Sequence, residues 1–515
     1  MALKRSAYIL FSIFLYSCGT TKPVVNKDDG IIDIQFLQIN DVYEIAPIEA
    51  GKVGGVARVA TIKKELKEKN PNTSLIIAGD FLSPSIYNSL SYEGKRVRGR
   101  QMVEALNAAG LDIAAFGNHE FDISEGELQS RINESAFDWV SSNSYHKTKD
   151  AMIPFVKTDS KGTHRIPTYI IKTYKDADGT TAKVGFIGIN IPFNKANYVV
   201  YTEPLESAEK TYNLIKDSCD VVVAITHQDE QDDILFAKQL PVIPLIIGGH
   251  EHDNRFDKIG DVIISKAHAN ARSAYILNLT IDKNTGKIAT TSALKMIDST
   301  VAMDPATDAV VKKWTKIANA NFASLGFDAQ AIILHRGEPL DVRETSIRIG
   351  STNFTRLVVK AMEAGAPQSQ LSIVNAGSLR LDDKLQPPVT QYDIIRSMPF
   401  GGGIMEADMK GSLLKKILDA AKGNTGSGGY LHYSESLFFD NSSKIWKYKN
   451  EPVADEQVFR VAIADFLLTG GEANLGFLTK DNPGILKVYP VSTAKEDPRT
   501  DIRTAVIKYI QSLQQ

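Results

Sequence analysis

Short hydrophobic runs rich in β-branched residues alternate with longer segments of helical periodicity from residue 31 onward. Runs of the first kind are typical of buried strands, and segments of the second kind are typical of helices that cover a sheet. Seven runs predict strands, at Asp33–Ile39, Ser74–Ala78, Ile113–Phe116, Lys183–Ile189, Asp220–Ile225, Val242–Ile247 and Val262–Ser265. The pattern therefore predicts an α/β fold.

Amphipathic segments predict the helices. Gly55–Asn70 has one apolar and one charged stripe, and Val97–Ala109 stops before a glycine, which commonly ends a helix. Asp304–Gly326 is expected to be a connecting helix, because the pattern shifts near Lys295 and a second α/β unit runs from about Ala331 to the end. A chain of 515 residues is too long for one core, so several domains are expected.

The first eighteen residues have the pattern of an export signal. Lys4 and Arg5 precede an apolar run at residues 7–16, which is too short to span a bilayer. The run ends in Leu15-Tyr16-Ser17-Cys18, which resembles a bacterial lipoprotein signal. This resemblance implies an exported protein that is anchored through acylated Cys18, on the periplasmic face of a membrane or at the cell surface. A plain signal peptide is the alternative, and residues 19–30 read as a polar tether.

Composition argues against two further classes of protein. The net charge is −2 and the basic residues are dispersed, so a nucleic-acid polymer is not an expected partner. The chain has two cysteines, and acylation of Cys18 would leave Cys219 without a partner, which argues against a disulfide framework.

Potential metal ligands follow five of the predicted strands. These segments are Asn40-Asp41-Val42-Tyr43, Gly79-Asp80, Gly117-Asn118-His119-Glu120-Phe121-Asp122, Thr226-His227 and Gly248-Gly249-His250-Glu251-His252. The ends of strands are where an α/β sheet usually places its site, so we expect these side chains to converge. Carboxylates, an amide and imidazoles together suit two divalent ions such as Mn, Zn, Fe or Co. Such a pair can stabilise the attacking and leaving oxygens of a phosphate ester.

In this order, the five segments resemble those of the calcineurin-like metallophosphoesterases, and residues 31–515 resemble the bacterial 5′-nucleotidase / UDP-sugar hydrolase / 2′,3′-cyclic phosphodiesterase family. The resemblance implies a β-sandwich flanked by helices (αββα) at residues 31–297 and a linker with a connecting helix at 298–340. It also implies a smaller α/β substrate-binding domain at 341–515. A hinge in the linker is expected to bring metals and substrate pocket together.

The resemblance also implies roles for single residues. One ion would be held by Asp41 and His252, the other by Asn118, His227 and His250, and Asp80 would bridge the two. His119 and Asp122 would form the catalytic pair, in which a carboxylate orients an imidazole near the phosphate.

Tyr43 departs from the family pattern, which has a metal-binding histidine at this position. Three interpretations stay open. Tyr43 could ligate as a phenolate, which a trivalent ion such as Fe(III) would favour, or it could withdraw and leave one ion more weakly held. Alternatively, the protein could have lost catalysis and only bind nucleotide or metal.

The second half carries the expected substrate residues. Asn375 and Arg380 lie in a segment that resembles a family motif for nucleoside and phosphate, and Arg suits phosphate because its planar fork binds two oxygens. Phe400 and Phe466 match the two phenylalanines that sandwich a base in the family, Glu472 replaces its aspartate, and Arg348 is a further candidate phosphate ligand.

The expected activity is therefore metal-dependent release of phosphate from nucleoside 5′-monophosphates. Cyclic-nucleotide phosphodiesterase, UDP-sugar hydrolase and broad phosphomonoesterase activities are the alternatives within the same class.

Overall fold

The computed structural model describes residues 28–193, 196–381, 383–491, 494 and 496–514. The expected export signal, Cys18 and most of the tether lie outside these residues. Within the described part of the chain, no helix combines the length and the apolar character that crossing a membrane requires.

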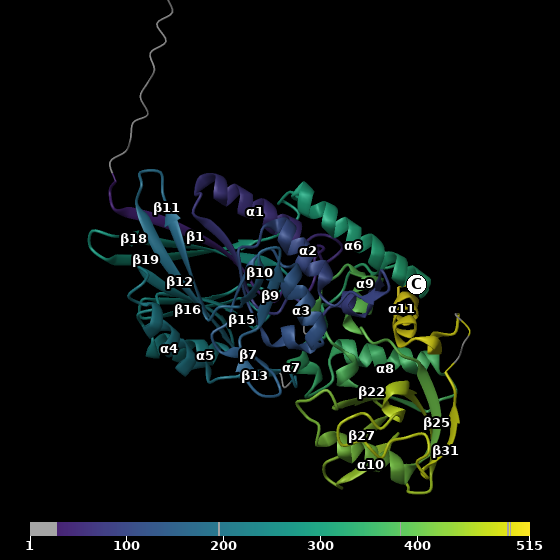
Figure 1. The fold of residues 1–515 in the computed structure, drawn as a ribbon. Coiled ribbons are helices and arrows are strands. Elements are labelled where there is room, and N and C mark those ends of the chain that lie inside the picture. Colours follow the sequence, from purple (N-terminus) through teal and green to yellow (C-terminus); the bar gives the residue numbers. More distant parts are fainter. Residues whose placement is uncertain (1–27, 194–195, 382, 492–493, 495, 515) are drawn as a thin grey trace, which may run out of the picture.

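Two six-stranded sheets stack face to face in the N-terminal half (Figure 1). The first sheet has the order β19 (Lys287–Met296), β18 (Ser273–Asp282), β1 (Ile31–Ile39), β2 (Thr73–Ala78), β5 (Ile113–Ala115), β6 (Asp138–Val140). The second has the order β11 (Tyr169–Lys175), β12 (Thr181–Asn190), β14 (Val221–His227), β15 (Leu245–Gly249), β17 (Val262–Lys266), β16 (Arg255–Ile259). Their facing side chains, such as Phe36 and Phe186, form a continuous buried core.

Helices cover the outer faces of both sheets. Helices α1 (Val56–Lys69) and α2 (Arg100–Ala109) pack their apolar stripes on the first sheet. Helices α4 (Pro204–Ile215) and α5 (Glu230–Gln239) do so on the second. The predicted αββα arrangement is confirmed.

The C-terminal half has a sheet of its own. Its strand order is β26 (Leu431–Tyr433), β22 (Leu371–Asn375), β30 (Val458–Ala464), β25 (Ile404–Lys410), β31 (Ile485–Tyr489). Helices α8 (Asn353–Gly365) and α11 (Ile502–Ser512) cover one face, and α10 (Gly411–Lys422) covers the other. This unit is the smaller α/β domain that the sequence predicted.

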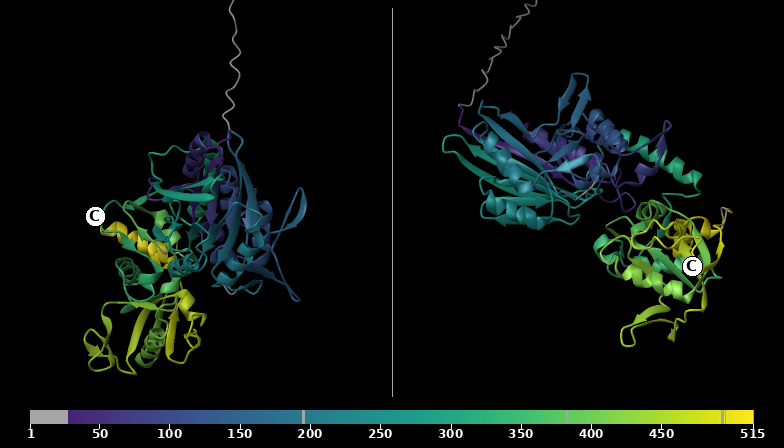
Figure 2. Two further views of the ribbon diagram at one scale, coloured as in Figure 1. Left: turned by 90° about the vertical axis from the view of Figure 1, so that its left-hand side faces the viewer. Right: turned by 60° about the horizontal axis from the view of Figure 1, so that its bottom comes forward.

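Helix α6 (Pro305–Ser324) connects the two halves (Figures 1 and 2). Trp314 donates from Nε1 to Glu104 of α2 at 2.9 Å, while Phe322 near its other end lies 6.0 Å from the ring of Tyr392 in α9 (Gln391–Ser397). The apolar cluster on α1 and α2 therefore continues along α6 into the C-terminal domain.

Two predicted boundaries are wrong, for identifiable reasons. The helix predicted from Val97 begins at Arg100, because Arg98 and Gly99 have φ of 40° and 83°, in the left-handed region. The strand predicted from Val242 begins at Leu245, because the Ile243 N–H bonds to the Leu240 carbonyl in a turn.

Strands β18 and β19 were not among the predicted runs. Most side chains of β19 are exposed, so its sequence lacks a strong apolar signal.

Candidate active site

The predicted metal ligands lie in loops at the carboxyl ends of parallel strands. Asp41 follows β1, Asp80 follows β2, His227 ends β14 and His250 follows β15. The backbone at Asp41, Asp80 and His250 is left-handed, with φ of 52°, 54° and 91°. This conformation is costly for non-glycine residues and is concentrated at functional sites. At Asp41 and Asp80 it belongs to the loops that bring both carboxylates to His227.

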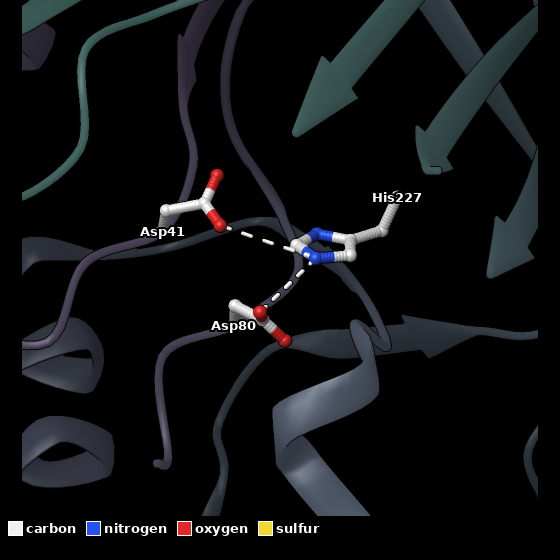
Figure 3. A group of neighbouring side chains, drawn as sticks. All are labelled: Asp41, Asp80 and His227. Atoms are coloured by element: carbon white, nitrogen blue, oxygen red, sulfur yellow. Dashed lines mark ion pairs between the residues drawn. The ribbon is translucent and has the colours of Figure 1, made fainter. Parts of the chain in front are cut away.

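Asp41, Asp80 and His227 form the centre of the site (Figure 3). His227 Nε2 lies 3.1 Å from Asp80 Oδ2 and 3.9 Å from Asp41 Oδ1, and all three side chains are buried. His227 Nδ1 donates to the Ala78 carbonyl at 2.8 Å, which directs Nε2 at the carboxylates. Metal-binding histidines are commonly oriented by such a second hydrogen bond, so this donor set fits a divalent ion.

Glycines beside the ligands let the loops approach closely. A Cβ at Gly117 would lie 2.2 Å from Asp80 Oδ1, and one at Gly249 would lie 2.2 Å from the Ala78 carbonyl. Any larger residue at either position would displace the carboxylate or the strand end that positions His227.

Tyr43 points into the same cluster. Its hydroxyl lies 3.0 Å from His252 Nε2 and 3.4 Å from both Asp41 Oδ1 and Asp80 Oδ2. His252 Nε2 is in turn 3.8 Å from Asp41 Oδ1. The Tyr43 hydroxyl therefore lies among the predicted ligands in this structure.

The other two predicted ligands lie beside this centre. The His250 N–H donates to Asp41 Oδ2 at 3.0 Å and its ring lies 5.3 Å from that of His227, but its Nε2 is 3.2 Å from Asp229 Oδ1. Asn118 is buried at the start of the short helix η2 (Asn118–Asp122). The next residue, His119, donates its N–H to Asp80 Oδ1 at 2.8 Å.

His119 and Asp122 form the predicted pair. His119 Nδ1 is 2.7 Å from Asp122 Oδ2, and both side chains are partly exposed. Ser83 Oγ also donates to Asp122 Oδ2, at 3.2 Å. The carboxylate thereby fixes the ring and leaves His119 Nε2 for a substrate oxygen.

The carboxylates hold protons on the neighbouring imidazoles. Burial alone lowers the pKa of His227, but Asp80 and Asp41 outweigh burial and raise the pKa to about 10. In the same way, Asp80 and Asp122 raise the pKa of His119 to about 9 against the effect of burial. Burial raises the pKa of Asp80, but His227 and His119 outweigh burial and hold the pKa well below its usual range. A cation entering the site would therefore compete with a proton on His227.

Two positioning residues escaped the sequence analysis. Glu120 is buried and accepts from the N–H groups of Gly117, Asp80, Phe81 and Leu82 at 2.6–3.0 Å, which shapes the Asp80 loop. Glu120 lies in the same sequence motif as His119, and this position could have marked it as part of the site. Lys266 is buried between Asp233 and Glu251, at 2.9 and 2.5 Å. A single lysine at the end of a strand gave no signal in the sequence.

A cavity of about 310 Å³ lies between the two domains beside this centre. Its walls include Tyr43 and Asp122 from the N-terminal domain and Arg380 and Phe400 from the C-terminal domain. The structure thus brings Asp122 of the predicted catalytic pair and part of the predicted substrate set to one space.

The remaining substrate candidates lie on neighbouring loops. Asn375 Nδ2 donates to Glu472 Oε2 at 2.6 Å. Arg348 pairs with Glu344, which is also 3.9 Å from Arg380, so the two arginines lie near one carboxylate. Phe400 and Phe466 are 71% and 45% exposed, so both rings are accessible to a ligand.

Three histidines outside the five motif segments have no part in this centre. His146 pairs with Glu125 and His164 with Asp159, at 2.8 and 3.1 Å. His432 is buried, and burial lowers its pKa to about 4.

Comparison with known proteins agrees with this geometry. Residues 34–254 match the calcineurin-like phosphoesterase family and residues 332–478 match the 5′-nucleotidase C-terminal domain. A 5′-nucleotidase from Bos taurus is 23% identical over 475 residues, covering 82% of this chain and 78% of that protein. Protein UshA from Yersinia enterocolitica is 24% identical over 558 residues, covering 92% and 95%. The crystal structure of a 5′-nucleotidase precursor from Thermus thermophilus aligns with a TM-score of 0.65 at 20% identity, covering 94% and 97%.

The fold and the site together define a metallophosphoesterase, a hydrolase of phosphoric esters. Within that class, the chain belongs to the family in which a calcineurin-like phosphoesterase domain precedes a 5′-nucleotidase C-terminal domain.

Proposed function

We propose that this protein releases phosphate from nucleoside 5′-monophosphates at a centre of two divalent ions. The position of Asp80 carries the proposal. Its Oδ2 lies 3.1 Å from His227 Nε2 and 3.4 Å from the Tyr43 hydroxyl, so it contacts members of both groups of potential ligands. A carboxylate oxygen between two groups of donors is placed as a bridge between two ions would be.

The donors divide into two sets around Asp80. We assign Asp41 and His252 to one ion and His227, His250 and Asn118 to the other, although Asp41 Oδ1 also lies 3.9 Å from His227 Nε2. When bound, a pair of divalent ions supplies an activated water and stabilises charge on the attacking and leaving oxygens.

Proton donation and substrate binding are assigned to side chains of the protein. The protonated His119 ring, held by Asp122, is placed to donate from Nε2 to the leaving oxygen. Arg380 and Arg348 offer cationic forks to the substrate phosphate, while Phe400 and Phe466 offer exposed faces for a base. Base–aromatic stacking contributes about 1–3 kcal/mol per base, which favours nucleotides over simple phosphoesters.

The test compares the wild type with Asp80→Ala, by phosphate release from AMP in added Mn²⁺ or Co²⁺ and by metal content after dialysis. We expect Asp80→Ala to lose metal and at least about 10³-fold in rate, since several kcal/mol of transition-state stabilisation depend on the ions. Asp253→Ala is the matched control, because Asp253 lies next to His252 but its carboxylate is 70% exposed.

Substrate choice needs a panel of AMP, UDP-glucose, 2′,3′-cyclic AMP and p-nitrophenyl phosphate. A preference for AMP supports the proposal. A preference for another ester would keep the metal centre and overturn the substrate assignment, and full metal occupancy without turnover on any ester would indicate a binding protein.

A further inference from the structure

The hydroxyl of Tyr43 occupies a place among donor atoms that a coordinating oxygen would occupy. It is 3.0 Å from His252 Nε2 and 3.4 Å from Asp41 Oδ1 and Asp80 Oδ2. Ligands bound at about 2.0–2.2 Å from one ion lie about 3–3.5 Å apart when they are neighbours in a tetrahedral or octahedral shell. The three separations of the hydroxyl fall in this range.

The backbone and packing hold the ring in this place. Tyr43 is 7% exposed and its N–H donates to Asn270 Oδ1 at 3.1 Å, while the Asn270 N–H donates to the Asp41 carbonyl at 2.8 Å. The rings of Tyr43 and His252 meet edge to face at 5.4 Å. These contacts fix the loop that carries both Asp41 and Tyr43, so the phenol is aimed at the carboxylates by the fold.

We infer that Tyr43 is a ligand of one of the two ions, through its phenolic oxygen, together with Asp41, Asp80 and His252. This inference rests on the proposed two-metal function. It gives a metal-binding role to Tyr43, the residue that departs from the family pattern. The O–H bond breaks as the oxygen binds the cation, and the proton leaves to solvent.

The donor set indicates which ion this site selects. Asp41 and Asp80 supply two anionic oxygens and the phenolate supplies a third, beside a single imidazole from His252. Hard, anionic oxygen donors favour hard cations of high charge over softer ones. Fe(III) meets this requirement, so this site would hold a trivalent ion in place of one of the two proposed divalent ions, and the second site, with His227 and His250, suits a divalent ion such as Zn²⁺.

The alternative is that Tyr43 stays protonated and only hydrogen-bonds to Asp41 or His252. Its ring would then fill the place of an ion, and the protein would hold one metal. The two interpretations differ in metal count and in spectrum, because a phenolate bound to Fe(III) absorbs visible light by charge transfer and a neutral phenol does not.

The experiment loads the metal-free protein with Fe(III) and Zn²⁺ and records bound metal, the visible spectrum, resonance Raman scattering and AMP hydrolysis. We expect two metals per chain, a visible band in the wild type and phenolate ring modes on excitation in that band. Tyr43→Phe should lose the band and bind one ion at least about tenfold more weakly. Tyr43→His should bind two ions without the band, which shows that loss of the band is not a loss of folding.

Tyr201→Phe is the matched control. Tyr201 packs edge to face on Phe121, at 5.9 Å between the ring centres, and its buried hydroxyl makes no hydrogen bond to the described residues. This variant should keep the band.

Each other outcome overturns the inference. Two bound metals, one of them Fe(III), without the band in an active wild type would make Tyr43 a non-ligand while leaving the proposed function intact. One metal and no band would favour the hydrogen-bonded phenol, and a band that persists in Tyr43→Phe would place the phenolate elsewhere. No binding of any metal would refute the proposed function itself.

Discussion

Replacing Asp122 by asparagine tests whether His119 acts as an oriented acid. The change keeps the size of the side chain but removes the charge that lies 2.7 Å from His119 Nδ1. Burial lowers the pKa of His119, while Asp80 and then Asp122 raise it, to about 9. Without the Asp122 charge, the pKa of His119 must fall.

The size of the effect follows from the contact. A hydrogen bond to a charged group contributes about 1.5–3 kcal/mol, and one pH unit corresponds to about 1.4 kcal/mol, so the pKa should fall by about one to two pH units. The active form is the protonated ring, so activity is lost as pH rises through this pKa. In Asp122→Asn the loss should begin at a lower pH by the same interval, and the rate at pH 8 should fall about 2- to 10-fold.

The assay is the pH profile of kcat for AMP with both metal sites filled. Glu125→Gln is the matched control, because Glu125 pairs with His146 at 2.8 Å in a contact of the same kind outside the site. If the alkaline limb of the kcat profile is unchanged in Asp122→Asn, or shifts equally in Glu125→Gln, Asp122 does not tune His119 as a catalytic acid.

Three further predictions concern metal affinity, base binding and stability. Because the pKa of His227 is raised to about 10, metal binding must displace its proton, so affinity should rise about tenfold per pH unit from about pH 6 to 9. Competition with a chelator at several pH values measures this, and a flat dependence would contradict it. Phe400→Ala should raise KM for AMP about 5- to 150-fold with little change in kcat, whereas Phe438→Ala, which changes another exposed phenylalanine, should leave KM as it is. Glu120→Gln should lower the free energy of unfolding by about 2–6 kcal/mol, because an NH₂ group would face two of the four backbone N–H groups that Glu120 binds; an unchanged melting temperature would show that the loop does not depend on this carboxylate.

Much of the fold was predictable because its central strands are buried on both faces. Strands such as β2 and β14 have every side chain buried, so their sequences are continuous apolar runs. Strand β19 was missed because it is largely exposed, and the helix start at Arg100 was misplaced because periodicity does not show the left-handed residues before it.

The candidate site was predictable where potential ligands directly follow the end of a strand. It was less predictable where contacts between distant parts of the chain set the position of a side chain. Asp41, Asp80 and His227 meet as their positions implied. The sequence left the role of Tyr43 open, because contacts with Asn270 and His252, both more than two hundred residues away, help to hold the ring in the cluster. For the same reason, no local pattern could reveal that Arg380 and Asp122 line one cavity.

The most direct test of the central claim is anomalous diffraction from crystals of the protein grown with Mn²⁺ and a non-hydrolysable AMP analogue. We expect two anomalous peaks about 3.5–4 Å apart, one on each side of Asp80 Oδ2, with a phosphate oxygen facing both and the base near Phe400. A single peak at this position, or peaks only at surface carboxylates, would contradict the claim that these strand ends hold a pair of ions against a phosphoryl group.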